Sequence, residues 1–189
     1  MKDFKDIKKL LINVDMVNGF VKEGAMADSY IEHIIPEHIK LMEQNEGEIA
    51  IIKDTHKENC REFKRYPVHC VEGTEEAELV DELKRFEENT LVYEKNSTST
   101  IYAENFLADI DKMTNLEEVI IIGCCTDICI LNLAIPLQNY FDQKDRNITI
   151  TIPKNAVETY DAPNHNRDEY NEIAFKLMVQ AGINLVDSI

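Results

Sequence analysis

Short runs of consecutive apolar residues that stop at a charged residue are the feature of this chain that most constrains its fold. Leu10–Val14 is such a run, interrupted only by Asn13, and it stops at Asp15. Residues that are apolar at successive positions, rather than at alternate ones, are typical of strands buried on both faces of a parallel sheet. The expected strands are 9–15, 48–54, 90–95, 118–123, 147–152 and 183–186.

Segments with apolar residues at helical spacing separate these runs. In the segment that begins at Ser29, isoleucines recur at intervals of three and four residues. The expected helices are 29–43, 75–86, 127–141 and 168–181. Strands alternating with helices predict a three-layer α/β/α architecture around a mostly parallel sheet of about six strands. At 189 residues, we expect a single domain over 1–189, with long irregular stretches at 55–75 and 96–104.

Composition excludes several classes of function. The chain has 36 acidic and 20 basic residues and a formal net charge of −16. This charge argues against binding to nucleic acid or to an anionic membrane surface, although one small acidic ligand is compatible with it. No apolar stretch approaches the roughly 18 residues of a spanning helix, and the first run is too short for a signal peptide. We therefore expect a cytoplasmic protein whose five cysteines are free thiols.

Polar residues follow three of the expected strands. Asp15, Asp54 and Lys95 each lie at the carboxyl end of one, and the segment 123–129 (Gly-Cys-Cys-Thr-Asp-Ile-Cys) follows a fourth. The carboxyl ends of parallel strands share one edge of the sheet, where ligands bind. These acids could simply cap or solvate the strand ends. Because a cysteine at a helix start accompanies them, we predict a catalytic site at this edge.

Cys129 is the expected nucleophile. With Thr126 or Asp127 as the N-cap, it falls in the first helical turn, where the helix dipole lowers a thiol pKa. Backbone N–H groups there can also stabilise an oxyanion. The alternative for any free cysteine is a place in the core, and Cys124 is assigned to it. No histidine is near in sequence, so proton transfer and charge stabilisation fall to Asp15 and Lys95.

A second set of residues favours a divalent metal. Asp54 and His56 lie two residues apart at a strand end, and His69 follows 13 residues after His56. Two imidazoles with one or two carboxylates suit zinc, iron or manganese. Glu62 is a further carboxylate in the same stretch. Cys60 and Cys70 offer a thiolate alternative, which is less favoured because Cys70 directly follows His69 and would point away from it.

Together these segments resemble the isochorismatase-like cysteine hydrolase superfamily, and more narrowly its nicotinamidase/pyrazinamidase branch. The similar motifs are Gly123–Ile130, Asp15 with Phe20, Glu94–Thr98, Asp54–His56 and Tyr66–Thr74. The last of these is the most specific, because this branch has a metal-ligating histidine in a W-P-x-H-C-x-x-G-T segment. The resemblance implies a Rossmann-like, isochorismatase-like fold.

The resemblance also implies roles for individual residues. It implies a catalytic triad of Cys129, Asp15 and Lys95, and a metal held by Asp54, His56 and His69 with Glu62 as a further ligand. It implies an oxyanion hole formed by the amides of Cys125 and Cys129, with a cis peptide between Cys124 and Cys125. It also implies a substrate ring flanked by Phe20 and Tyr66, with Cys125 beside it. The activity implied is hydrolysis of nicotinamide to nicotinate and ammonia through a Cys129 thioester, a step of NAD salvage. Members are often homo-oligomers.

The chain departs from the branch at several positions. Residues 16–19 lack the usual glutamine and second acid, Tyr66 replaces a common tryptophan, and Asn-Ser-Thr-Ser-Thr follows Lys95. These differences leave open another small carboxamide as substrate, or a non-catalytic member of the fold that binds a partner. Outside the motifs, His33 and His38 are expected to be solvated on a charged helix face. His165 is expected to cap a helix or to be exposed.

Overall fold

The computed structural model describes residues 3–189, and its centre is a sheet in which every strand pairing is parallel. The strands are β1 (Lys9–Val14), β2 (Glu48–Asp54), β3 (Leu91–Lys95), β4 (Glu118–Cys124), β5 (Thr149–Pro153), β6 (Val157–Glu158) and β7 (Asn184–Val186). Their order is β3-β2-β1-β4-β5-β7, and β6 pairs with β4 beyond the end of β5. The prediction of a parallel α/β fold is confirmed, and the short strand β6 is the one that sequence reasoning missed.

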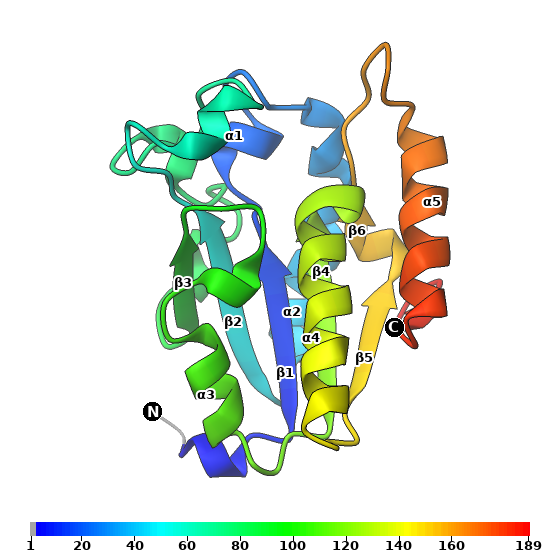
Figure 1. Ribbon diagram of the computed structural model, residues 1–189. Helices are drawn as coiled ribbons and strands as arrows, with labels where there is room; N and C mark the ends of the chain where they lie inside the picture. The colour runs from blue at the N-terminus through cyan, green and yellow to red at the C-terminus, as the bar shows by residue number, and fades with distance from the viewer. Residues whose placement is uncertain (1–2) are drawn as a thin grey trace.

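Helices cover both faces of this sheet. They are α1 (Asn18–Val21), α2 (Ile35–Gln44), α3 (Phe106–Lys112), α4 (Leu131–Gln143) and α5 (Arg167–Gln180). In Figure 1, α3, α4 and α5 lie on the near side of the sheet, whereas α2 lies behind it. The sheet is therefore the middle of three layers, as expected. No helix within residues 3–189 is long and apolar enough to cross a membrane.

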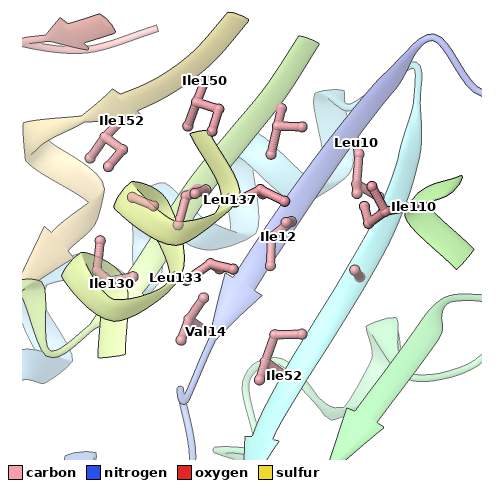
Figure 2. Packing of buried hydrophobic residues seen from close by; sticks show 14 of the residues in the cluster. Leu10, Ile12, Val14, Ile52, Ile110, Ile130, Leu133, Leu137, Ile150 and Ile152 are labelled. Carbon is pink, nitrogen blue, oxygen red and sulfur yellow. The ribbon is translucent and has the colours of Figure 1, made fainter. Parts of the chain in front are cut away.

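Strand β1 shows why the apolar runs are continuous. Leu10, Ile12 and Val14 point into the cluster formed with α3, α4 and α5. Figure 2 shows Leu133 of α4 close to Ile12 and Val14, and Ile110 of α3 close to Leu10. Leu11 points to the opposite face, into the cluster formed with α2. Both faces of the strand are buried, so each successive side chain leaves water and contributes to stability.

The segment 75–86 is not the helix predicted for it. It holds two short 3₁₀ turns, Glu75–Ala77 and Lys84–Phe86, because the chain between them bonds to another segment. The N–H of Val80 donates to the Met16 carbonyl at 3.0 Å, and Leu79 bridges Val17. Tertiary backbone hydrogen bonds have replaced helical ones.

The expected helix 29–43 is divided. Ser29–Ile34 forms a 3₁₀ helix, and α2 begins at Ile35 with Pro36 in its first turn, where a proline needs no N–H partner. Helices α1 and α3 were not predicted.

The prediction that His38 is solvated is wrong. His38 lies on the inner face of α2, one helical turn from the buried Leu41, and is fully buried itself. Its Nδ1 lies 3.0 Å from Asn13 Oδ1 and its Nε2 lies 2.9 Å from the carbonyl oxygen of Ala156. Burial lowers the pKa of His38 to about 4, so the ring is neutral near pH 7. His33 is half exposed, in line with the prediction.

Candidate active site

Four chain segments meet above the carboxyl edge of the sheet, at the top of Figure 1. Asp54 and Lys95 are register partners on β2 and β3, and Asp15 directly follows β1. Gly123, near the end of β4, pairs with Val14 and has φ +130°. A Cβ at Gly123 would lie 2.0 Å from the Val14 carbonyl oxygen. Only glycine therefore allows β4 to approach β1 this closely where the site begins.

Lys95 is the centre of a buried charge cluster. Its Nζ lies 2.9 Å from Asp15 Oδ2, 2.7 Å from Asp54 Oδ1 and 3.8 Å from Cys129 Sγ. All four residues are buried. One ammonium thus contacts both carboxylates and the thiol, so the structure brings together the three residues of the expected triad.

Burial and neighbouring charges set the proton affinities of this cluster. Burial raises the pKa of Asp15 to about 6, although Lys95 acts in the opposite direction. Burial would lower the pKa of Lys95, but the carboxylates of Asp15 and Asp54 outweigh it and the pKa is raised. Burial also raises the pKa of the Cys129 thiol, and Lys95 opposes this only in part. The expected low thiol pKa is therefore wrong for the free site, because desolvation of the thiolate exceeds the stabilisation available to it.

Cys129 lies in the turn that leads from β4 into α4. Residues Thr126–Ile130 form one π-helical turn, and Cys125 is its N-cap rather than either predicted residue. The peptide between Cys124 and Cys125 is cis, as the resemblance implied. Cys124 is fully buried in the core, as predicted. Within residues 3–189, no backbone carbonyl accepts a hydrogen bond from the Cys125 N–H, which leaves that group free for a ligand oxygen.

A donor cluster lies beside the triad and consists of Asp54, His56, His69 and Glu62. His56 Nε2 lies 3.0 Å from Asp54 Oδ2 and 3.2 Å from His69 Nε2, and His69 Nε2 lies 3.3 Å from Asp54 Oδ2. His69 Nδ1 donates to the Pro67 carbonyl at 2.7 Å. That bond fixes the ring and leaves its Nε2 lone pair for a metal ion.

Two further observations fit a metal at the donor cluster. The side chain of Glu62 is buried, and its Oε2 lies 4.0 Å from His56 Nε2 and has no hydrogen-bond partner among residues 3–189. A buried carboxylate oxygen without a donor is costly unless a cation neutralises it. Histidine nitrogens and carboxylate oxygens are the ligands that zinc, iron and manganese take.

Of the two cysteines that could provide a thiolate ligand, only one lies near the donor cluster. Cys60 lies close enough to His56 and Glu62 for the three to share an ion. Cys70 is fully buried in the cluster beneath α2, with its Sγ next to Gly19. Cys70 therefore points away from the donor cluster, as its place after His69 predicted.

A pocket opens above Cys129. It is lined by Phe20, Met26, Asp54, Glu62, Tyr66, His69, Thr98, Cys125, Ile128, Cys129 and Tyr160. Phe20 and Tyr66 are among these residues, as expected, whereas Asp15, Lys95 and His56 are not. Sequence reasoning missed Met26, Thr98, Ile128 and Tyr160. Thr98 could have been found from the hydroxyl-rich run after Lys95, whereas no sequence signal marks Tyr160.

The loop after Lys95 supports both halves of the site. Asn96 Oδ1 accepts from the Lys57 N–H at 3.1 Å and lies 3.4 Å from His56 Nδ1, while Thr98 donates to Glu62. Ser99 Oγ donates to the Asn132 carbonyl of α4 at 2.6 Å. That carbonyl lacks a helical partner because the residue four positions later is Pro136, which has no N–H. The unusual sequence Asn-Ser-Thr-Ser-Thr thus fastens the donor cluster to the nucleophile helix.

The prediction for His165 is wrong. The residue is buried, and its Nε2 donates to Asp127 Oδ2 at 2.8 Å. Asp127 Oδ1 also accepts from Thr159 Oγ1 at 2.6 Å. The carboxylate of Asp127 is thereby directed to the loop between β6 and α5, instead of capping its own turn.

Comparison with known proteins places the chain in a family. A model of the isochorismatase domain matches residues 9–189. Nicotinamidase 1 of Arabidopsis thaliana is 30% identical over 139 residues, which cover 65% of this chain and 57% of that protein. The chain thus spans little more than half the length of this relative. An uncharacterized isochorismatase family protein, PncA, of Bacillus subtilis (strain 168) is 26% identical over 176 residues, 84% of this chain and 91% of the other.

Solved structures agree with this placement. The nicotinamidase/pyrazinamidase PncA of Bacillus subtilis is 26% identical with a TM-score of 0.75, and covers 95% of this chain and 100% of its own. The pyrazinamidase of Pyrococcus horikoshii, solved in complex with zinc, is 26% identical with a TM-score of 0.74, over 95% and 98% of the two chains. The family match, the parallel sheet and the arrangement of residues at its carboxyl edge agree, and the chain is a member of the isochorismatase family with the fold of the family's nicotinamidases.

Proposed function

We propose that this chain is a single catalytic domain that hydrolyses the amide bond of nicotinamide, giving nicotinate and ammonia. The observation that carries the proposal is the contact of one buried ammonium, Lys95 Nζ, with Asp15, Asp54 and the thiol of Cys129. A second support is the pocket above the thiol, whose aromatic lining includes Phe20. The names of the relatives support the choice of substrate.

The first half of the reaction acylates the thiol. As Cys129 Sγ attacks the amide carbon, Asp15 accepts the thiol proton. Because burial raises the pKa of Asp15 to about 6, this carboxylate is ionised at neutral pH and still basic enough to hold a proton briefly. Lys95 stabilises the negative charge of the carboxylate and the thiolate. Asp15 then protonates the amide nitrogen, the C–N bond breaks, and ammonia leaves a thioester.

The second half releases the acid. A water molecule transfers a proton to Asp15 and attacks the thioester carbon, the C–S bond breaks, and the proton returns to the Cys129 sulfur. In both halves the carbonyl oxygen gains negative charge. The N–H of Cys125, which donates to no backbone carbonyl within residues 3–189, would stabilise that charge together with the N–H of Cys129.

The donor cluster would hold a divalent cation through Asp54, His56, His69 and Glu62. A bound cation would supply Lewis acidity toward the ring nitrogen of the substrate or toward a water molecule. Phe20 and Tyr66 flank the ring, which directs the carboxamide toward the thiol. Asp54 joins the two parts, because its Oδ1 contacts Lys95 and its Oδ2 contacts His56.

The test is ammonia release from nicotinamide, with metal content measured on the same preparation. Replacing the nucleophile in Cys129→Ala should reduce turnover by at least about 10⁴-fold. Cys70→Ala is the matched control, because it removes a buried thiol that points away from the pocket and should leave turnover within about threefold of wild type. Substantial turnover by Cys129→Ala, or a wild-type protein with metal but without release of ammonia from nicotinamide, would contradict the proposal.

A further inference from the structure

An aromatic stack lies behind one residue of the pocket lining, Tyr160. The ring of His165 lies between Tyr160, at 3.9 Å and 8° between the planes, and Tyr170, at 3.8 Å and 27°. These three residues, Tyr160, His165 and Tyr170, are called the aromatic stack below. Tyr170 belongs to α5, and the other two belong to the loop that rises from β6 in orange in Figure 1.

Hydrogen bonds fix the middle ring of the stack. His165 Nε2 donates to Asp127 Oδ2 at 2.8 Å, and its Nδ1 lies 3.0 Å from the carbonyl oxygen of Tyr160. Asp127 belongs to the same turn as Cys129, two residues before it. The ring that supports Tyr160 is thus held by the nucleophile turn itself, and the stack keeps a defined position relative to the thiol.

Tyr160 is the member of the stack that reaches the pocket. It lines the same space as Cys125 and Cys129. No group in residues 3–189 forms a hydrogen bond with its hydroxyl, whereas the Tyr170 hydroxyl bonds to Asn164. Tyr160 therefore presents an aromatic ring and an unpartnered hydroxyl to whatever occupies the pocket, and the mechanism above assigns it no role.

We propose that Tyr160 contacts the ring of the carboxamide substrate and sets its affinity, and that His165 is a positioning residue that holds Tyr160 in place. The inference rests on the proposed function in that it takes an aromatic carboxamide as the ligand. A flat, fixed tyrosine stacks on a planar ring more favourably than on an alkyl amide, so this wall selects for aromatic substrates.

The experiment separates binding from chemistry. Nicotinamide turnover is measured for Tyr160→Ala, Tyr160→Phe, His165→Leu and His165→Phe, and nicotinamide binding to the same changes in a Cys129→Ala background is measured by calorimetry. We expect Tyr160→Ala to raise KM and Kd about tenfold, with kcat within about threefold of wild type. His165→Leu should raise them about fivefold, whereas His165→Phe, which keeps a flat ring between the tyrosines, should stay within about twofold. Tyr160→Phe measures how much of the affinity for nicotinamide depends on the tyrosine hydroxyl.

Tyr140→Ala is the matched control, because it removes a tyrosine ring near the far end of α4 and should change neither constant. The His165→Phe rescue separates positioning from folding, since a purely structural requirement for the histidine hydrogen bonds would make both His165 variants equally poor.

The outcomes distinguish the two proposals. Turnover with KM and Kd unchanged in Tyr160→Ala overturns this inference and leaves the proposed function standing. Binding of nicotinamide that depends on Tyr160, without turnover by the wild type, leaves the inference standing and overturns the function. If nicotinamide neither binds the Cys129→Ala protein nor is turned over by the wild type, both are overturned.

Discussion

The two sides of the pocket, the donor cluster and the aromatic stack, are held in place by different kinds of interaction. The donor cluster is held by buried charges, and its members touch one another directly through His56, His69 and Asp54. The aromatic stack is held by ring contacts and by hydrogen bonds, among them the one from His165 to Asp127. Side chains that bind a metal must lie at fixed positions along strands and loops, so their spacing forms motifs in the sequence. A stacked wall needs only rings that meet in space, so it leaves none.

The largest expected effect comes from removing the ammonium group of Lys95, which contacts Asp15 of the triad and Asp54 of the donor cluster. Lys95→Met leaves the carboxylates of Asp15 and Asp54 buried without their cation, so we expect the free energy of unfolding to fall by about 3–5 kcal/mol. Turnover should fall by at least about 10³-fold. Urea unfolding and ammonia release measure the two effects.

Lys53→Met is the control for Lys95→Met. Lys53 is also a buried lysine, on β2, but its partners Glu78 and Glu87 are partly exposed and become solvated when it is removed. We expect a smaller loss of stability and turnover within about threefold of wild type. Equal losses in both variants would show that the charge cluster has no special place in the fold.

Removing one ligand separates the two sides of the pocket. His56→Ala should weaken metal binding by at least about 100-fold, because His56 is fully buried and contacts both Asp54 and His69. Metal content after dialysis against a chelator measures this. His165→Leu should keep its metal, and so should the exposed control His33→Ala. Loss of metal from His165→Leu would mean that the two sides form one unit.

The smallest effect concerns the buried histidine of α2. His38 faces the Ala156 carbonyl, directly before β6, and burial lowers its pKa to about 4 from an ordinary value near 6.5. The unfolded chain therefore binds a proton at a higher pH than the folded protein does. Stability from this group is full above pH 6.5 and is lost as the pH falls toward 4, by about 2 kcal/mol between pH 7 and pH 5.

Urea unfolding of wild type and His38→Gln at both pH values measures this term. The variant should lose less stability than the wild type over the same range, because glutamine does not titrate. Identical pH dependence in the two proteins would contradict a neutral, buried His38.

Sequence reasoning reached the parts of the molecule that depend on local order. Continuous apolar runs predicted the sheet, and polar residues at strand ends predicted which side chains meet at its edge. It failed where distant segments decide the outcome. The segment 75–86 has helical spacing, yet Val80 bonds to Met16 instead. His165 sits in a polar stretch, yet two tyrosines and Asp127 enclose it. The thiol pKa of Cys129 depends on burial, which no local pattern reveals.

The proline in the nucleophile helix has a consequence for how this protein can vary over evolution. Pro136 frees the Asn132 carbonyl, and Ser99 donates to that carbonyl from the loop beside the donor cluster. A residue with an N–H at position 136 could reclaim the carbonyl for the helix, and the Ser99 hydroxyl would lose this acceptor. The two positions, 37 apart in the chain, should therefore change together among relatives. A relative that keeps one without the other must fasten its loop by different means.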